Sequence, residues 1–363
     1  MGRIALHHGS RRGNQCGYSE SDSPVKMQRR VFLLATLGAA ACGRRDNSAL
    51  ARAVRWLWSQ QSQDGGWHGK TYGLLRSGQS LTPFVLDALL GLPNEGPGVD
   101  QAFEFLKRNT NADGSLGLSD SAAPDYPNYA TGLAVRVAAR LKRDASQWIA
   151  CLRGQQFTEG NGWTRNDPAY GAWGMGGERR RPPEPGHVDL AMTRYVLEGL
   201  AAAGVSTSDP TMHKAIVYLD RCQNPDGGFF FSTVNLDTNK AGDVNGKYRS
   251  YGTTTCDGLL SMRAAGVAAS DPRIARAQAW LKKNHLEERA PGFDIEPARM
   301  GWSEGLRFYY AAAITRAMPE LAVLLPTERA DGSFANGNNL VKEDDPLLAT
   351  AFAVRVLCHD KDG

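Results

Sequence analysis

Three consecutive carboxyl groups, Glu343-Asp344-Asp345, stand directly before Pro346 and an apolar segment. A carboxylic acid can protonate a substrate only if it carries a proton at the working pH, and burial beside other carboxylates favours that state. Asp344 and Asp345 are therefore candidate catalytic acids. The alternative is a structural role, because Asp at the N-cap position followed by Pro at the first helical position is a favoured start of a helix.

Asp189 and Asp257 lie near the starts of two further apolar segments. An unpaired carboxylate is unfavourable in such surroundings. We therefore expect each acid to have a partner or a raised pKa, and Arg194 and Arg249 are the nearest candidate partners in the sequence. Asp189 is the third candidate catalytic acid.

Metal chemistry is the next possibility, because His187, Asp189 and Cys256 are all residue types that bind Zn²⁺. Cys256 and Asp257 are neighbours, however, and neighbouring residues of a helix point about 100° apart, so they do not easily share one ion. The cysteines also form no C-x-x-C pair. The sequence therefore predicts no metal site and no cofactor.

A repeated turn indicates which elements position these residues. Four turns have the pattern Asp-Gly-small-apolar, and two weaker copies lack the Asp. They are Asp64–Trp67, Asp113–Leu116, Asp226–Phe229 and Asp331–Phe334, with the weaker copies at Gly160–Trp163 and Pro291–Phe293. An amphipathic helix is expected before each turn, as in Met212–Cys222, and a more apolar helix after it.

Helices that are apolar all round are buried, so the second helix of each pair should lie inside. The most economical arrangement is an all-α toroid, an (α/α)6 ring of six helix-turn-helix repeats over residues 49–358. The 42% content of hydrophobic residues supports a sizeable core.

The spacing Gln-x-x-x-Gly-x-Trp at Gln61–Trp67, with Phe as the aromatic at Gln223–Phe229, resembles the QW repeat of the prenyltransferase/squalene-cyclase superfamily. The resemblance covers residues 49–357 and implies the toroid fold. The run Lys240–Gly252 is similar to bacterial envelope members of this group, whose activity is undefined.

The resemblance implies an apolar central cavity and a terpenoid-cyclase or prenyltransferase-like activity on an isoprenoid or another hydrophobic small molecule. The cyclase motif of the superfamily is Asp-x-Asp-Asp, and this chain matches it in part, with Lys342 in place of the first Asp. Two alternatives remain open. One is a non-catalytic toroid that binds a lipid, peptide or glycan at the mouth of the ring, and the other is a carbohydrate-active toroid enzyme.

If the six units repeat in register, the starts of the inner helices converge at one end of the ring. Polar and aromatic groups that converge on a hollow are the default site. The candidate substrate-binding residues are Tyr129, His187, Arg249, Tyr251, Asp257 and Tyr309. We expect Asp189, Tyr251 and Asp344 to line one cavity, with the loops 165–186 and 232–248 over its mouth.

The N-terminal region has a different character. Residues 1–26 are polar and patternless and are expected to be a disordered or mis-started leader. Residues 27–42 resemble an export signal, with a twin-arginine start at Gln28–Leu33 and an Ala-Ala-Ala-Cys end that favours lipidation of Cys42. These features predict export to the bacterial cell envelope or periplasm, with a membrane tether through Cys42.

The distribution of charge bears on possible partners. Residues 1–45 hold eight Lys or Arg against two Asp or Glu, which leaves 34 basic and 36 acidic residues in the remainder, a net charge of −2. A body without a basic excess makes nucleic acid an unexpected partner.

Overall fold

The computed structural model describes residues 47–92, 98–118, 126–294 and 296–359, all within one helical unit that spans residues 46–363. The leader, the export signal and Cys42 lie outside the described residues, and the expectations about them stay predictions. Among the described residues, no helix combines the length and the apolar character needed to cross a membrane.

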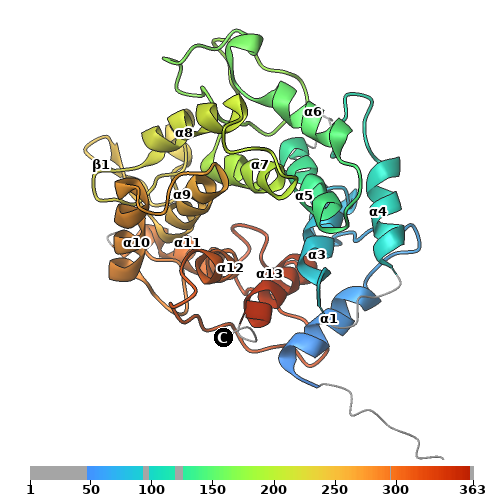
Figure 1. Cartoon of the computed structure of the whole chain (residues 1–363). Coiled ribbons are helices and arrows are strands. Elements are labelled where there is room, and N and C mark those ends of the chain that lie inside the picture. Colours follow the sequence, from blue (N-terminus) through green and yellow to red (C-terminus); the bar gives the residue numbers. More distant parts are fainter. Residues whose placement is uncertain (1–46, 93–97, 119–125, 295, 360–363) are drawn as a thin grey trace, which may run out of the picture. The chain divides into compact units, whose positions relative to one another are not determined.

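Six helices form a closed inner ring (Figure 1). Each packs against the next, and the last packs against the first. In ring order they are α3 (Leu81–Leu89), α5 (Pro127–Arg140), α7 (Leu190–Ala202), α9 (Gly252–Ala264), α12 (Arg307–Ala317) and α13 (Pro346–His359). The (α/α)6 toroid predicted from the repeats is confirmed.

Outside the inner ring lies a second layer (Figure 1). Its helices are α1 (Ala49–Ser59), α4 (Val99–Arg108), α6 (Ser146–Gln155), α8 (Pro210–Cys222) and α10 (Pro272–Asn284). The connections carry the short helices α2 (Gly73–Arg76) and α11 (Met300–Gly305), the 3₁₀ turns η1 (Glu159–Asn161), η2 (Leu236–Thr238) and η3 (Pro297–Arg299), and an antiparallel hairpin of β1 (Asp243–Val244) and β2 (Lys247–Tyr248).

The outer layer departs from the simplest form of the repeat at one place. After α12 the chain runs from residue 318 to residue 345 without a helix, where a sixth outer helix would stand. Part of this segment has exposed Leu324 and Leu340. The structure therefore describes six inner helices but five full outer ones.

Sequence patterning explains why the layers separate. In α9 every residue from Gly252 to Met262 is buried. In α4, by contrast, Ala102, Phe103, Phe105 and Leu106 are buried while the polar residues face outward, as expected for an amphipathic surface helix.

The Gln of the repeat joins consecutive units. Gln61 donates from Nε2 to its own turn at Gly65 O and to Gly98 O at the start of the next outer helix, both at 2.9 Å. Gln156 and Gln223 make the same pair of bonds in their units. We call this arrangement the Gln staple. Its role is structural.

In the first unit, the aromatic residue of the turn is anchored to both of its helices. Trp67 donates from Nε1 to Leu57 O at 2.7 Å and from its backbone N–H to Thr82 Oγ1 at 2.9 Å. Four other inner helices supply an equivalent threonine, which the sequence analysis missed. These are Thr131, Thr193, Thr255 and Thr350.

The third turn is not where the sequence predicted. Gln156 bonds to Gly171 O, and the anchored aromatic is Trp173, which donates to Leu152 O at 2.7 Å. The predicted Trp163 lies in an inserted loop and packs edge-on against Phe157. Residues 160–163 read Gly-Asn-Gly-Trp, whereas Gly171-Ala-Trp173 has the Gly-x-Trp spacing of the first turn, and it is Trp173 that bonds to Thr193 on the inner helix.

Candidate functional site

The loops that precede the inner helices contact one another around one end of the ring, which we call its N-terminal end. Near the start of α5, Asn128 donates to Gly174 O, and Gly174 forms a bridge with Val188, just before α7. On the other side, Glu343, before α13, accepts from the first turn of α12. The opposite end, where the inner helices finish, is the C-terminal end.

Asp345 begins α13 as the capping interpretation of the sequence predicted. Its Oδ1 accepts from Leu347 N at 3.0 Å and from Leu348 N at 3.4 Å. Burial, together with the charge of Asp344, raises the pKa of Asp345 despite these bonds. No described residue donates a hydrogen bond to the second oxygen, Oδ2. The residue therefore combines a helix cap with a free carboxyl oxygen.

Asp344 is half-buried beside Asp345 and accepts a hydrogen bond of 2.6 Å from Tyr72 Oη. This bond raises the pKa of Tyr72 to about 12, because the phenol loses a good acceptor if it ionises. Lys342 lies 5.8 Å above the Tyr72 ring. Asp344 and Asp345 thus form two adjacent carboxyl groups with different hydrogen-bond partners.

A pocket of about 730 Å³ opens beside Asp345, between α1 and the start of α13. Trp56, Pro346 and Leu347 supply its larger apolar surfaces, and the remaining lining is mostly polar. Gly69 also lines it, and a Cβ at that position would lie 3.2 Å from Asp345 Oδ2. The glycine therefore leaves space next to the free carboxyl oxygen.

Glu343 has a structural position. It accepts the backbone N–H groups of Phe308 and Tyr309, at 2.9 and 2.7 Å, and a bond from Asn336. Burial raises its pKa to about 7 despite these donors. Its carboxyl group caps the start of α12 and joins α12 to the segment before α13.

Asp189 caps α7 through Met192 N, at 2.7 Å, and pairs with His187 Nε2 at 2.8 Å. The partner of this buried acid is therefore a histidine and not Arg194.

Lys240, from the loop 232–248, lies near both Asp189 and Asp257. Burial lowers the pKa of Lys240, and the charges of these two acids oppose that shift. Its ammonium lies 4.0 Å from the centre of the Phe231 ring and 5.6 Å from that of Trp302.

Lys240 was not among the residues singled out from the sequence, although it begins the run that carried the resemblance to envelope proteins. No local sequence signal distinguishes Lys240, because Lys247 lies in the same loop and both acids lie elsewhere in the chain. The structure brings it together with Asp189, Asp257 and Tyr251 at the N-terminal end.

Asp257 pairs with Arg194 at 2.8 Å, as predicted, and accepts a 2.9 Å hydrogen bond from Tyr309 Oη. Burial raises the pKa of Asp257 to about 6 even though Arg194 opposes the shift.

Tyr129, another candidate binding residue, packs edge-on against Tyr195, with ring centres 4.4 Å apart.

Tyr251 is buried, and its phenol lies within the electrostatic range of Asp189 and Asp257. Arg249 does not pair with either inner-helix acid, and instead bonds to Glu296 at 2.9 Å. The structure therefore separates Arg249 from the other predicted binding residues.

The middle of the ring differs from the apolar central cavity expected from the resemblance. The cavity between α7, α12 and α13 has a volume of about 10 Å³. Arg194, Arg316 and Arg355 line it together with aromatic and alanine side chains. Because the inner helices carry charged residues toward their C-terminal ends, this part of the interior is narrow and charged.

Metal ligands do not assemble among the described residues. No group of three or more His, Cys, Asp or Glu side chains in that part of the chain could hold an ion. Cys256 is buried, and His187 is used by Asp189.

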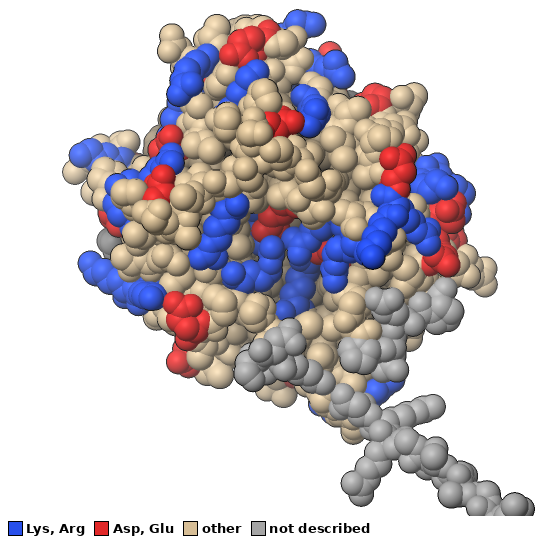
Figure 2. Space-filling model, viewed as in Figure 1, with Lys and Arg blue, Asp and Glu red and all other residues tan. Residues whose placement is uncertain are grey.

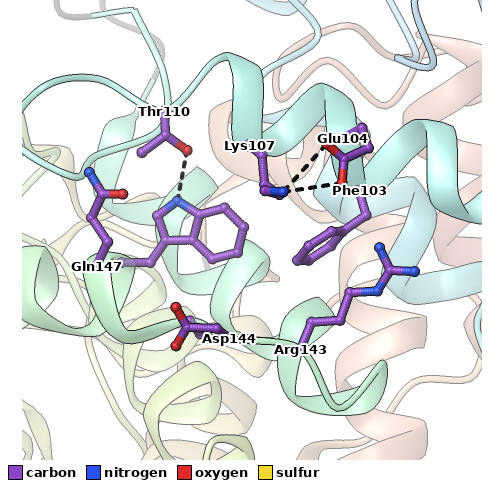
Figure 3. Close-up of a pocket in the computed structure, with 9 residues that line it drawn as sticks. Phe103, Glu104, Lys107, Thr110, Arg143, Asp144 and Gln147 are labelled. Carbon is purple, nitrogen blue, oxygen red and sulfur yellow. Dashed lines mark hydrogen bonds and ion pairs between the residues drawn. The ribbon is translucent and has the colours of Figure 1, made fainter.

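A further pocket, of about 490 Å³, lies in the outer layer between α4 and α6 (Figure 3). Phe103 and Trp148 form its aromatic wall, and Arg143 lies 4.6 Å from the centre of the Phe103 ring. The Ser146 hydrogen bonds lower the pKa of Asp144 at its edge. The hydrogen bonds to Asp144 favour its charged form, whereas burial beside the other pocket raises the pKa of Asp345.

Comparisons with known proteins point to one superfamily. Residues 186–288 match the model of the squalene-hopene cyclase C-terminal domain. A probable squalene–hopene cyclase of Sinorhizobium fredii is 26% identical over 242 residues, which are 66% of this chain and 30% of that protein. Drimenyl diphosphate synthase of Streptantibioticus cattleyicolor is 28% identical over 199 residues, 51% of this chain and 32% of that protein. The matched region therefore spans about a third of each relative.

Among solved structures, the type II terpene cyclase MstE from Scytonema superposes with a TM-score of 0.53 at 15% identity, covering 86% of this chain and 98% of that one. A variant of the same protein, bound to its substrate geranylgeranyl dihydroxybenzoate, gives a TM-score of 0.52 at 16% identity, with 86% and 96% covered. At this identity the likeness concerns the fold alone.

Proposed function

We propose that this chain, which belongs to the prenyltransferase/squalene-cyclase repeat superfamily, is a terpene-cyclase-like enzyme that acts on an isoprenoid. The observation that carries the proposal is Asp345. It is a carboxyl group with a raised pKa and a free oxygen, and it lies at the wall of a pocket of about 730 Å³. Perturbed acids in a cleft are good candidates for chemistry.

The proposed chemical step is protonation of a carbon–carbon double bond by Asp345. The Oδ2–H bond breaks, the proton adds to one alkene carbon, and the other carbon becomes a cation that a second double bond can attack. Loss of a proton from a carbon beside the product cation turns the C–H bonding pair into a new double bond and gives a neutral product, and Asp345 regains a proton from water before the next cycle. Asp344 supports this role because its negative charge makes ionisation of Asp345 harder.

Tyr72 and Trp56 have supporting roles in this proposal. Tyr72 holds Asp344 in place through the 2.6 Å hydrogen bond. Trp56 lines the same pocket, and an aromatic face attracts a nearby cation. The pocket volume lies within the range of roughly 300–1,000 Å³ typical of small-molecule sites.

The isoprenoid class is supported by the relatives. Two are squalene–hopene cyclases by description, and the structurally similar MstE has a geranylgeranyl-bearing substrate. Squalene and a geranylgeranyl-bearing phenol are therefore the first substrates to test.

The test compares Asp345→Asn with Asp271→Asn. Asn keeps an oxygen that accepts the helix N–H groups but cannot donate an acidic proton, so both variants should keep their helix caps. Asp271 caps the outer helix α10 through a backbone N–H and also pairs with Arg273, and it lies outside the pocket, which makes it the control. Products would be identified by gas chromatography and mass spectrometry.

We expect cyclised product from the unchanged chain and from Asp271→Asn, and a loss of roughly 100-fold or more in Asp345→Asn, the usual scale for removing a general acid. Full activity in Asp345→Asn would show that another group supplies the proton. No cyclised product from any isoprenoid with the folded unchanged chain would overturn the proposed activity.

A further inference from the structure

A second hollow lies at the C-terminal end of the ring, away from Asp345. It has a volume of about 510 Å³. Its charged lining comes from four inner helices, with Arg136 and Arg140 on α5, Glu198 on α7, Arg263 on α9 and Arg316 on α12. Lys and Arg side chains gather around the middle of the ring on this face (Figure 2). We call it the arginine pocket.

Two buried carboxylates behind the arginine pocket each form ion pairs with three arginines. Glu198 pairs with Arg136 at 3.0 Å, with Arg316 at 2.9 Å and with Arg194 at 3.3 Å. Burial opposes its ionisation, but the three guanidinium groups outweigh burial and hold the pKa of Glu198 well below its usual value.

Asp87 likewise forms ion pairs with Arg136, Arg140 and Arg355, at 3.1, 2.9 and 2.9 Å. These guanidinium groups hold the pKa of Asp87 at about 2 despite its burial. With the Asp257–Arg194 pair, three carboxylates therefore face five arginines.

Arg263 adds a sixth positive charge. It has no carboxylate within 4.0 Å among the described residues, and its one hydrogen bond, of 2.8 Å, goes to Ala317 O at the end of α12. Burial lowers the pKa of Arg263, and the charge of Glu320, which forms no ion pair with it, opposes this shift. Its remaining N–H groups are available to a ligand.

The ends of the inner helices reduce this positive excess. A helix C-terminus carries a partial charge of about −0.5, which attracts the arginines. Arg140 and Arg263 already bond to carbonyl groups there, at Leu90 O and Ala317 O. Because Arg263 makes one hydrogen bond among the described residues, its other N–H groups still offer a positively charged donor to a ligand in this pocket.

The shape of the pocket fits a ligand larger than a simple ion. Small apolar residues, Ala201, Ala202, Leu260 and Ala264, line it beside the arginines. Guanidinium groups bind phosphate oxygens through paired hydrogen bonds. A phosphate group against the arginines, with an attached organic part against the alanines, would fill such a hollow.

We propose that the arginine pocket binds a phosphate-bearing ligand, at a site separate from the one that contains Asp345. The phosphate can belong to a small soluble ester or to a lipid headgroup. The proposal does not depend on the cyclase activity, because the pocket lies at the other end of the ring and beyond its narrow charged middle.

The test measures binding of inorganic diphosphate to the full chain by isothermal titration calorimetry, and of anionic and neutral phospholipid vesicles by flotation. Arg263→Gln is the main variant, because Arg263 takes no part in the carboxylate pairs and its loss should leave the fold intact. The matched control is Arg165→Gln, an exposed arginine in the loop 165–186.

We expect saturable diphosphate binding that weakens roughly tenfold in Arg263→Gln and is unchanged in Arg165→Gln. Binding to diphosphate alone identifies a soluble phosphate ester as the ligand class, and binding to anionic vesicles alone identifies a lipid headgroup. The proposal is overturned if the unchanged chain binds neither probe, if Arg263→Gln binds as tightly as the unchanged chain, or if chloride at equal ionic strength competes equally well.

Discussion

At the scale of single residues, the carboxyl groups before α13 divide into different roles, although they are consecutive in the sequence. Glu343 caps α12, Asp345 caps α13, and Asp344 holds Tyr72. The capping role of Asp345 was predictable, because Asp followed by Pro is a local signal. The role of Glu343 was not, since it depends on the first turn of a different helix.

Glu343 should make stability depend on pH. Its pKa is about 7 in the folded chain against an ordinary value of 4.5. The stability that it contributes is therefore fully present below pH 4.5 and is lost as the pH rises through 7, by on the order of 3 kcal/mol. Melting temperatures at pH 5 and pH 8 should fall less with rising pH in Glu343→Gln than in the unchanged chain. Equal falls in both would contradict this assignment.

Replacing Arg194 should lower the free energy of unfolding more than replacing most other residues. Arg194→Met leaves Asp257 buried without the one ion-pair partner it has in the described part of the chain, and Glu198 with one fewer. We expect a loss of about 3–5 kcal/mol in the free energy of unfolding, measured with urea. Lys282→Ala, which breaks an exposed pair with Glu320, should cost less than about 1 kcal/mol. Similar losses in both variants would argue against the buried network.

At the scale of elements, the turn glycines set the distance between neighbouring outer helices. Gly227 has φ +92°, and a Cβ there would lie 2.6 Å from Arg276 O in the next outer helix. Gly65, Gly114 and Gly171 face the backbone of the following outer helix in the same way. Gly292 faces Ser250 and Tyr251 instead, because no sixth outer helix follows it.

Gly246 allows the stability cost of backbone strain to be measured apart from the cost of a close contact. It also has positive φ, at +75°, but a Cβ there would meet nothing within 4 Å. Gly246→Ala should therefore cost about 1 kcal/mol from strain alone, and Gly227→Ala should cost more, roughly 2–3 kcal/mol. Thermal unfolding of both variants measures the difference. Equal losses of stability would show that the contact of Gly227 with the next outer helix adds nothing to the cost.

At the scale of the whole molecule, the ring depends on its last helix. α13 packs against α12 on one side and α3 on the other, and α1 covers it. A chain that ends at residue 345 would leave the apolar faces of α3, α12 and α1 without a partner. We expect it to be insoluble or rapidly digested by protease, and a folded, protease-resistant truncated chain would contradict the closed ring.

The sequence predicted the ring because each repeat carries local signals, such as a turn glycine, a Gln and an aromatic residue. It did not predict the charged interior. Asp87, Glu198 and their arginines are far apart in the chain, and the inner segments looked apolar because their charges lie at a few positions that face the axis. The third turn was misplaced as well, because the Gly-Asn-Gly-Trp sequence of an inserted loop lies closer to Gln156 in the chain than Gly171-Ala-Trp173 does.

The joint between the last unit and the first resembles the joints inside the ring. Gly332 faces the backbone of Arg52 in α1, as Gly227 faces Arg276, and Glu328 binds Arg52 through both carboxylate oxygens at 2.6 Å. This junction is therefore built like those of the first four turns, in which a turn glycine also faces the backbone of the following outer helix. A circularly permuted chain, opened between α7 and α8 and joined from residue 359 to residue 47 by a short linker, keeps every one of these contacts.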